Sequence, residues 1–147
     1  MIERIKKYFD LQEVVCPHVY DNLRSLAWDF FDPRLLENML WLRESLGKPI
    51  FVNNWQIGGN LSQRGLRCNR CALVKEKTML EKVYMTPHGQ GTGLDFDVLG
   101  MTAQQVRDWI DKHQDEMPHP SRLESLVSWV HWDVRNYTSK KLIYFKG

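Results

Sequence analysis

The sequence has few cysteines, no long apolar run and little net charge, and each of these excludes a class of protein. It holds only three cysteines, which cannot all pair, so a disulfide framework is not expected. No apolar run reaches the ~18 residues of a membrane span, and the net charge of +2 is too small to indicate nucleic acid. We therefore expect a partner that is neither nucleic acid nor membrane.

The amino terminus also lacks the apolar core of a secretory signal, because Met1–Phe9 mixes charged with apolar residues. We expect synthesis in the cytoplasm without a signal peptide, so any action outside the cell would follow release by another agent. With 147 residues, 43% of them hydrophobic, the chain predicts one domain over residues 1–147 that buries its own core. We expect a monomer.

Two of the cysteines, Cys68 and Cys71, have the spacing of a zinc knuckle or a redox pair. The sequence has no second Cys-x-x-Cys, and no Cys/His pair at knuckle spacing completes a set of four ligands. We expect two reduced thiols in a loop, with a metal or redox role as the alternative.

The amino-terminal third of the chain is typical of helices. Asp10 and Glu13 have the spacing of a capping box, which predicts a short helical segment. A longer helix is predicted over residues 33–46, because Asp32 can cap its start and Gly47 its end, with apolar residues at helical spacing between them.

The remaining residues predict a small, mostly antiparallel sheet and one more helix. A long irregular segment is predicted over residues 54–78, followed by a short strand or turn at 80–85. A helix is predicted from Thr102 to about Lys112. Strands are predicted at residues 49–53, 94–98, 122–124, 126–134 and 141–145. The fold class is α+β, with N-terminal helices packed on the sheet.

Three polar residues have the types and spacing of a metal site. His88 and Asp95 lie seven positions apart, and the three glycines between them allow the chain to loop tightly. His131 lies inside an apolar, aromatic run that predicts a strand. Two imidazoles and a carboxylate make up the protein half of an open tetrahedral zinc site, with water in the fourth position.

These residues form two motifs, His88-x-x-Gly-x-Gly-x-Asp95 and, further on, Trp-Val-His131-Trp-Asp. Together they resemble the D-alanyl-D-alanine carboxypeptidase family of zinc peptidases, which shares its core fold with the sonic hedgehog signalling domain. The resemblance covers about residues 49–135, and the whole chain looks like the small, single-domain, phage-encoded branch. It implies that the two histidines and the aspartate are ligands of one zinc. Gly93 stands where the family has alanine.

The resemblance implies a zinc-dependent peptidase that hydrolyses amide bonds in stem or cross-link peptides of bacterial peptidoglycan. The resemblance does not decide between a carboxypeptidase and an endopeptidase. It is compatible with an endolysin, which would act on the cell wall after release. The family carries an upstream arginine that faces the substrate. Arg67 is the best match and Arg64 the second, so we expect Arg67 to polarise the scissile carbonyl and Arg64 to bind substrate.

The general base is not where the family has it. Ser128 and Trp129 stand at the usual positions, and neither can take a proton near neutral pH. Two carboxylates could substitute: Glu124, across a hairpin turn, and Asp133, which shares a strand face with His131. Asp133 could instead orient an imidazole.

The serine at position 128 supports an alternative function. The chain could be a zinc-stabilised, catalytically weak or inactive module that recognises cell-wall peptide or a protein partner. A metal-free α+β domain with incidental histidines is a third interpretation. Trp129, on the face of His131, is expected to contact substrate, whereas Trp132 is expected to lie in the core.

Overall fold

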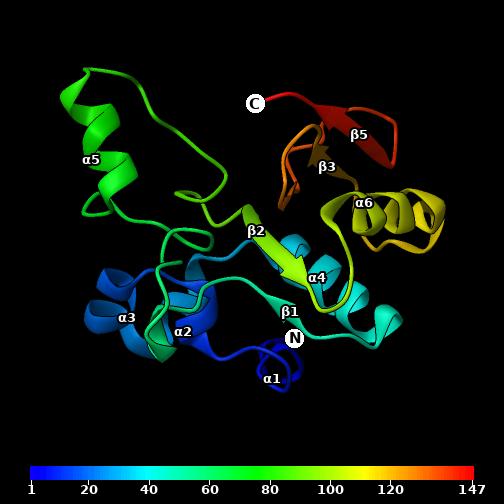
Figure 1. Cartoon of the computed structure of the whole chain (residues 1–147), viewed down its shortest axis with the longest axis horizontal. Coiled ribbons are helices and arrows are strands. Elements are labelled where there is room, and N and C mark those ends of the chain that lie inside the picture. The colour runs from blue at the N-terminus through cyan, green and yellow to red at the C-terminus, as the bar shows by residue number, and fades with distance from the viewer.

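Helices make up the first part of the chain and strands most of the last part, as the colours of Figure 1 show. The computed structural model describes residues 1–147. Its α-helices are α1 (Ile2–Ile5), α2 (Leu11–Val14), α3 (Pro17–Leu23), α4 (Pro33–Leu46), α5 (Ala72–Met79) and α6 (Ala103–Lys112). Three 3-10 turns are η1 (Arg24–Phe30), η2 (Trp55–Ile57) and η3 (Gln114–Glu116). None of the helices is long and apolar enough to cross a membrane.

The strands form one five-stranded sheet in the order β1-β2-β4-β3-β5. They are β1 (Ile50–Phe51), β2 (Gly93–Val98), β3 (Ser121–Glu124), β4 (Val130–Asp133) and β5 (Leu142–Phe145). β5 runs parallel to β3, and every other pairing is antiparallel. The predicted α+β class with a small, mostly antiparallel sheet is confirmed.

The longest helix, α4, has the ends that the sequence predicts. The Asp32 carboxylate accepts a hydrogen bond from the Arg34 N–H at 2.9 Å, and Gly47 ends the helix with a left-handed φ of 64°. Between these ends, the apolar face includes Leu35, Met39 and Leu42, all buried. Capping residues therefore set the ends of this helix, and burial of its apolar face stabilises it.

One face of the sheet packs against α4 and α6. The Trp132 ring on β4 is fully buried and lies 6.4 Å from the Trp41 ring of α4 and 6.3 Å from the Phe96 ring of β2. Trp109 of α6 adds a third contact, 5.5 Å from Trp41. Trp132 is therefore core, as predicted. Because neighbours on a strand point to opposite faces, His131 projects from the other face of the sheet.

One local prediction is wrong. The segment 54–78 is not irregular throughout, because α5 begins at Ala72. Of the strand or turn expected at 80–85, the turn is present, at residues 80–81. Cys16 is extended, as the residue before a proline usually is, and Pro17 then begins α3 in its first turn, where a proline needs no N–H partner.

Replacing Leu42 with alanine tests how much this core stabilises the fold. Leu42 is fully buried, so Leu42→Ala is expected to lower the free energy of unfolding by about 2–5 kcal/mol. Leu99→Ala is the matched control, because Leu99 is 55% exposed and should change stability by less than about 0.5 kcal/mol. Urea unfolding of both variants measures the difference. Equal losses would contradict the described packing of α4.

Candidate metal centre

The structure brings His88, Asp95 and His131 together beneath the surface. One donor atom from each lies within 4.8 Å of the others, and all three residues are buried. His88 comes from the turn before β2, Asp95 from β2, and His131 from the facing position on β4. The Asp95 Oδ1 atom lies 2.7 Å from His131 Nδ1 and 3.3 Å from His88 Nε2.

The other ring nitrogens have partners that set the tautomers. His88 Nδ1 lies 3.1 Å from the carbonyl oxygen of Gly65, and His131 Nε2 lies 3.1 Å from Asp133 Oδ2. When these nitrogens donate, the lone pairs of His88 Nε2 and His131 Nδ1 face the Asp95 carboxylate. Metal-binding histidines have this arrangement, with the second N–H given to a carbonyl or carboxylate. The residues present fit a divalent metal ion.

The electrostatics of the three groups depend on one another. Burial disfavours ionisation of Asp95, but hydrogen bonds with His131 and His88 hold its pKa well below the usual range. Burial also disfavours the charged form of His131, yet the carboxylates of Asp133 and Asp95 raise its pKa to about 9. Burial lowers the pKa of His88. A metal ion at His131 Nδ1 would have to replace a proton.

Asp133 is positioned to orient His131. Its carboxylate is fully buried and receives the Arg122 guanidinium through two contacts of 2.9 Å, and the Arg135 N–H at 2.8 Å. Its contact with His131 is on Nε2, away from the nitrogen that faces Asp95. This placement favours the orienting role over that of a general base.

Glu124 has a different environment. The pairing of Arg122 with Asp133 and of Leu123 with Trp132, continued by one residue, places Glu124 beside His131. Side chains at facing positions of neighbouring strands project to the same face, so Glu124 shares the face of His131. No hydrogen bond or ion pair occupies its half-buried carboxylate. Of the two candidate bases, only Glu124 has a free carboxylate.

The two candidate arginines line an open cleft of about 460 Å³, and Asp95 lies in the wall of the same cleft. Arg67 Nη2 lies 3.4 Å from Asp95 Oδ2, and its Nη1 lies 3.3 Å from the Tyr84 hydroxyl. Arg64 forms an ion pair with Asp97 at 2.6 Å. Two guanidinium groups, each paired with a carboxylate, therefore lie in the cleft next to the candidate metal centre. Ser128 and Trp129 complete this side of the cleft.

The backbone of residues 64–67, here called the connecting segment, bonds both to the turn that carries His88 and to the strand that carries Asp95. Its Arg64 carbonyl accepts the Asp95 N–H at 2.8 Å, and its Arg67 N–H donates to the His88 carbonyl at 3.2 Å. On its other side, Leu66 exchanges backbone hydrogen bonds with Val14 and Cys16, at 2.8 and 2.9 Å. This two-sided bonding fixes Arg67 beside Asp95.

Two contributions escaped the sequence analysis because they depend on long-range contacts. The buried Arg107 of α6 donates to the carbonyl oxygens of Trp129 and Val127, at 3.0 and 3.1 Å, and so fixes the loop between β3 and β4. An arginine in an amphipathic helix carries no sequence signal of this role. At Gly93, an added Cβ would lie 2.7 Å from the Pro87 Cβ and 2.8 Å from the Asp133 Cβ. Alanine there would force a shift.

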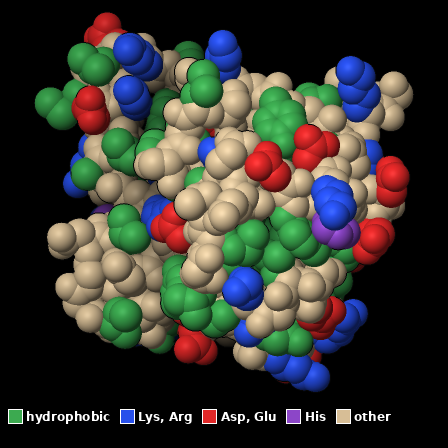
Figure 2. Space-filling view, turned by 45° about the vertical axis from the view of Figure 1, so that its right-hand side comes forward, with side chains coloured by type: hydrophobic (Ala, Val, Ile, Leu, Met, Phe, Trp, Pro, Cys, Tyr) green, Lys and Arg blue, Asp and Glu red, His purple; other side chains and the backbone are tan.

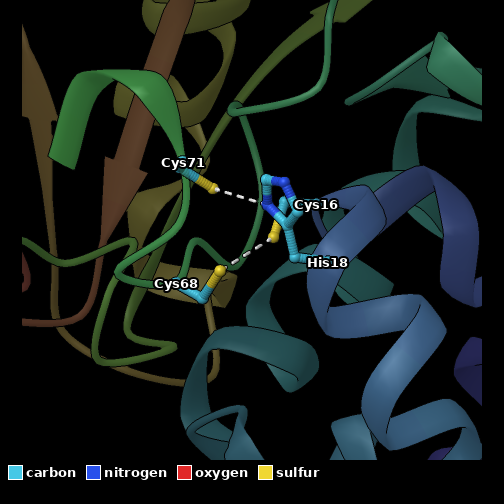
Figure 3. A group of neighbouring side chains, drawn as sticks. All are labelled: Cys16, His18, Cys68 and Cys71. Atoms are coloured by element: carbon cyan, nitrogen blue, oxygen red, sulfur yellow. Dashed lines mark hydrogen bonds between the residues drawn. The ribbon is translucent and has the colours of Figure 1, made fainter. Parts of the chain in front are cut away.

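Cys68 and Cys71 are free thiols in a loop, as expected, but they do not lie apart from other possible metal ligands. Cys68 and Cys71 lie next to Cys16 and His18, and donor atoms of all four residues are within 4.8 Å of one another. Figure 3 shows the four side chains pointing toward a common centre, two from the start of α3 and two from the turn before α5. In the sequence, the only local sign of this cluster besides Cys68 and Cys71 is the spacing Cys16-Pro-His18, which places a thiol and an imidazole close together.

Comparison with known proteins gives no family assignment. No family model matches the chain, no curated protein matches it, and no solved structure matches it.

Basic and acidic side chains are intermixed on the face shown in Figure 2, in keeping with a net charge of +2.

Gly65 offers a test of the connecting segment. A Cβ there would lie 1.9 Å from the Val14 carbonyl oxygen, so Gly65→Ala must push the segment away from α2. We expect a loss of about 1–3 kcal/mol in unfolding free energy and weaker zinc binding at His88. Gly89→Ala is the control, because its Cβ would make only ordinary contacts, the nearest at 3.7 Å. Denaturant unfolding and zinc titration measure both effects. If Gly65→Ala and Gly89→Ala gave equal results, the connecting segment would not be the support of His88.

Proposed function

We propose that this protein is a zinc-dependent peptidase that hydrolyses amide bonds in the stem or cross-link peptides of bacterial peptidoglycan. One observation carries the proposal: two imidazoles and a carboxylate converge under an open cleft whose wall holds two arginines. A set of nitrogen and oxygen ligands with one side open is typical of catalytic zinc. The choice of peptidoglycan rests on the resemblance of the two motifs to the D-alanyl-D-alanine carboxypeptidase family.

Zinc would be held by His88 Nε2, the Asp95 carboxylate and His131 Nδ1. When bound, it supplies Lewis-acid polarisation of a carbonyl and a water whose pKa falls to about 7. The chain itself orients these ligands: the Gly65 carbonyl holds one ring and Asp133 holds the other. Because Asp133 is locked by Arg122, the His131 ring has little freedom to rotate.

Arg67 would orient the substrate and stabilise the charge that develops on its carbonyl oxygen. The guanidinium has five N–H donors, and its contacts with Gln63, Tyr84 and Asp95 leave others free. Preorganised donors of this kind are a large term in acyl-transfer catalysis. Trp129, 39% exposed at the cleft, offers an apolar surface to the peptide chain.

Glu124 would act as the general base, taking a proton from the attacking water and returning it to the leaving amine. The position beside His131 and the absence of a competing cation support this assignment. We expect Glu124→Gln to lower kcat by about 10²- to 10⁴-fold while zinc stays bound. Asp133→Asn should act differently and lower zinc affinity by about 10- to 100-fold. Kinetics and zinc titration on both variants distinguish the roles, and an active Glu124→Gln enzyme would refute this choice of base.

The whole proposal is tested by digestion of purified peptidoglycan, with mass spectrometry of the released peptides. Zinc-loaded protein should release them, and His88→Ala should abolish release. His113→Ala is the matched control, because His113 stacks on Trp109 at 4.0 Å outside the cleft and should leave activity unchanged. Digestion by the His88→Ala protein would contradict the proposal.

A binding module is the second candidate, and one observation favours it. Both acidic residues that line the cleft, Asp95 and Asp97, are paired with arginines, and Ser128 stands at the family's usual base position. Such a module would hold zinc and sediment with peptidoglycan without releasing peptides. The digestion experiment, combined with sedimentation, separates the two functions.

A further inference from the structure

We infer that Cys16, His18, Cys68 and Cys71 form a second zinc site, closed and structural, that fastens the connecting segment to the amino-terminal helices. This site is separate from the candidate catalytic centre and does not depend on peptidase activity. Three thiolates and an imidazole are a common ligand set for structural zinc.

The distances fit tetrahedral zinc. With Zn–S bonds of about 2.3 Å, the sulfurs of such a site are about 3.8 Å apart. The Sγ atoms of Cys16 and Cys68 are 3.8 Å apart, and Cys71 Sγ is 4.0 Å from His18 Nδ1. All four donors lie within 4.8 Å of one another, so small side-chain rotations suffice to complete the site (Figure 3).

The four ligands come from two turns, one at the start of α3 and one before α5. Cys16 is the residue before α3 and His18 lies in its first turn, while Cys71 is the residue before α5. The Cys71 N–H donates to the Cys68 carbonyl at 3.1 Å, which closes the Cys-x-x-Cys turn. The Arg70 N–H points at the Cys68 sulfur at 3.4 Å, a contact that favours a thiolate.

The surrounding charge also fits. Three thiolates and one Zn²⁺ carry a net charge of −1, which a basic neighbour can offset. Arg70 and Lys75 line the shallow pocket that also contains Cys16, His18 and Cys71. No acidic side chain lines this pocket.

A disulfide explains the cluster less well. The sulfurs of Cys16 and Cys68 are 3.8 Å apart, against about 2.05 Å in a disulfide. A bond between them would leave Cys71 unpaired and would give no reason for the imidazole of His18 to join the group. A four-ligand metal site accounts for all four side chains.

The site has a consequence for the cleft. Cys68 directly follows Arg67, and the Cys16 N–H bonds to Leu66 of the connecting segment at 2.9 Å. Metal binding would therefore restrain the segment that carries Arg67 and the Gly65 carbonyl. Loss of this metal should loosen the cleft wall without removing any ligand of the other centre.

Cobalt(II) in place of zinc gives a direct test, because cobalt–thiolate charge-transfer absorption arises only where cysteine binds the metal. We expect this absorption in the wild-type protein and in His131→Ala, and its loss in Cys71→Ser. Zinc content should be about two ions per chain in wild type and about one in each of these variants. His113→Ala, outside both clusters, should keep both ions. Absence of thiolate absorption in wild-type protein would overturn the inference.

A second measurement on wild-type protein covers the case in which the cysteine variants do not fold. Zinc should protect Cys16, Cys68 and Cys71 together from alkylation under reducing conditions, and chelation should expose all three and lower the melting temperature. Equal alkylation rates with and without zinc would overturn the second site. Failure of peptidoglycan digestion would leave this result unaffected, so the two proposals fail independently.

Discussion

The connecting segment, residues 64–67, is the constraint on which both clusters depend. One side of its backbone bonds to Val14 and Cys16, and the other to His88 and Asp95. These bonds involve the main chain, so they require a close approach that only glycine allows at position 65. The segment thereby joins the amino-terminal helices to the strand that carries the carboxylate of the candidate metal centre.

Burial of so many charged groups is tolerated because each has a partner. An unpaired buried charge lowers the folding stability by roughly several kcal/mol, whereas a buried charge that is paired and hydrogen-bonded is tolerated. Asp133 is matched by Arg122, and Asp95 by two imidazoles and Arg67. The result is a rigid set of donors on one face of the sheet, with the opposite face filled by Trp132 and its aromatic neighbours. Rigid ligands beside an open cleft are what a catalytic metal site needs.

Local signals in the sequence predicted much of this arrangement, and long-range contacts account for the rest. The caps of α4 and the alternating pattern of β2 depend on residues that are close in the sequence, so both elements could be predicted. The short pairing of Leu66 with Val15 has no such signal, because a single bridge depends on tertiary contact. For the same reason the Cys/His cluster was missed: its two halves are far apart in the chain, and each half alone is incomplete.

The most direct test of the candidate metal centre is a crystal structure of zinc-loaded protein, with anomalous diffraction measured at the zinc absorption edge. We expect an anomalous peak within bonding distance of His88 Nε2, the Asp95 carboxylate and His131 Nδ1. An empty map at that point, with His131 Nδ1 still hydrogen-bonded to Asp95, would contradict it.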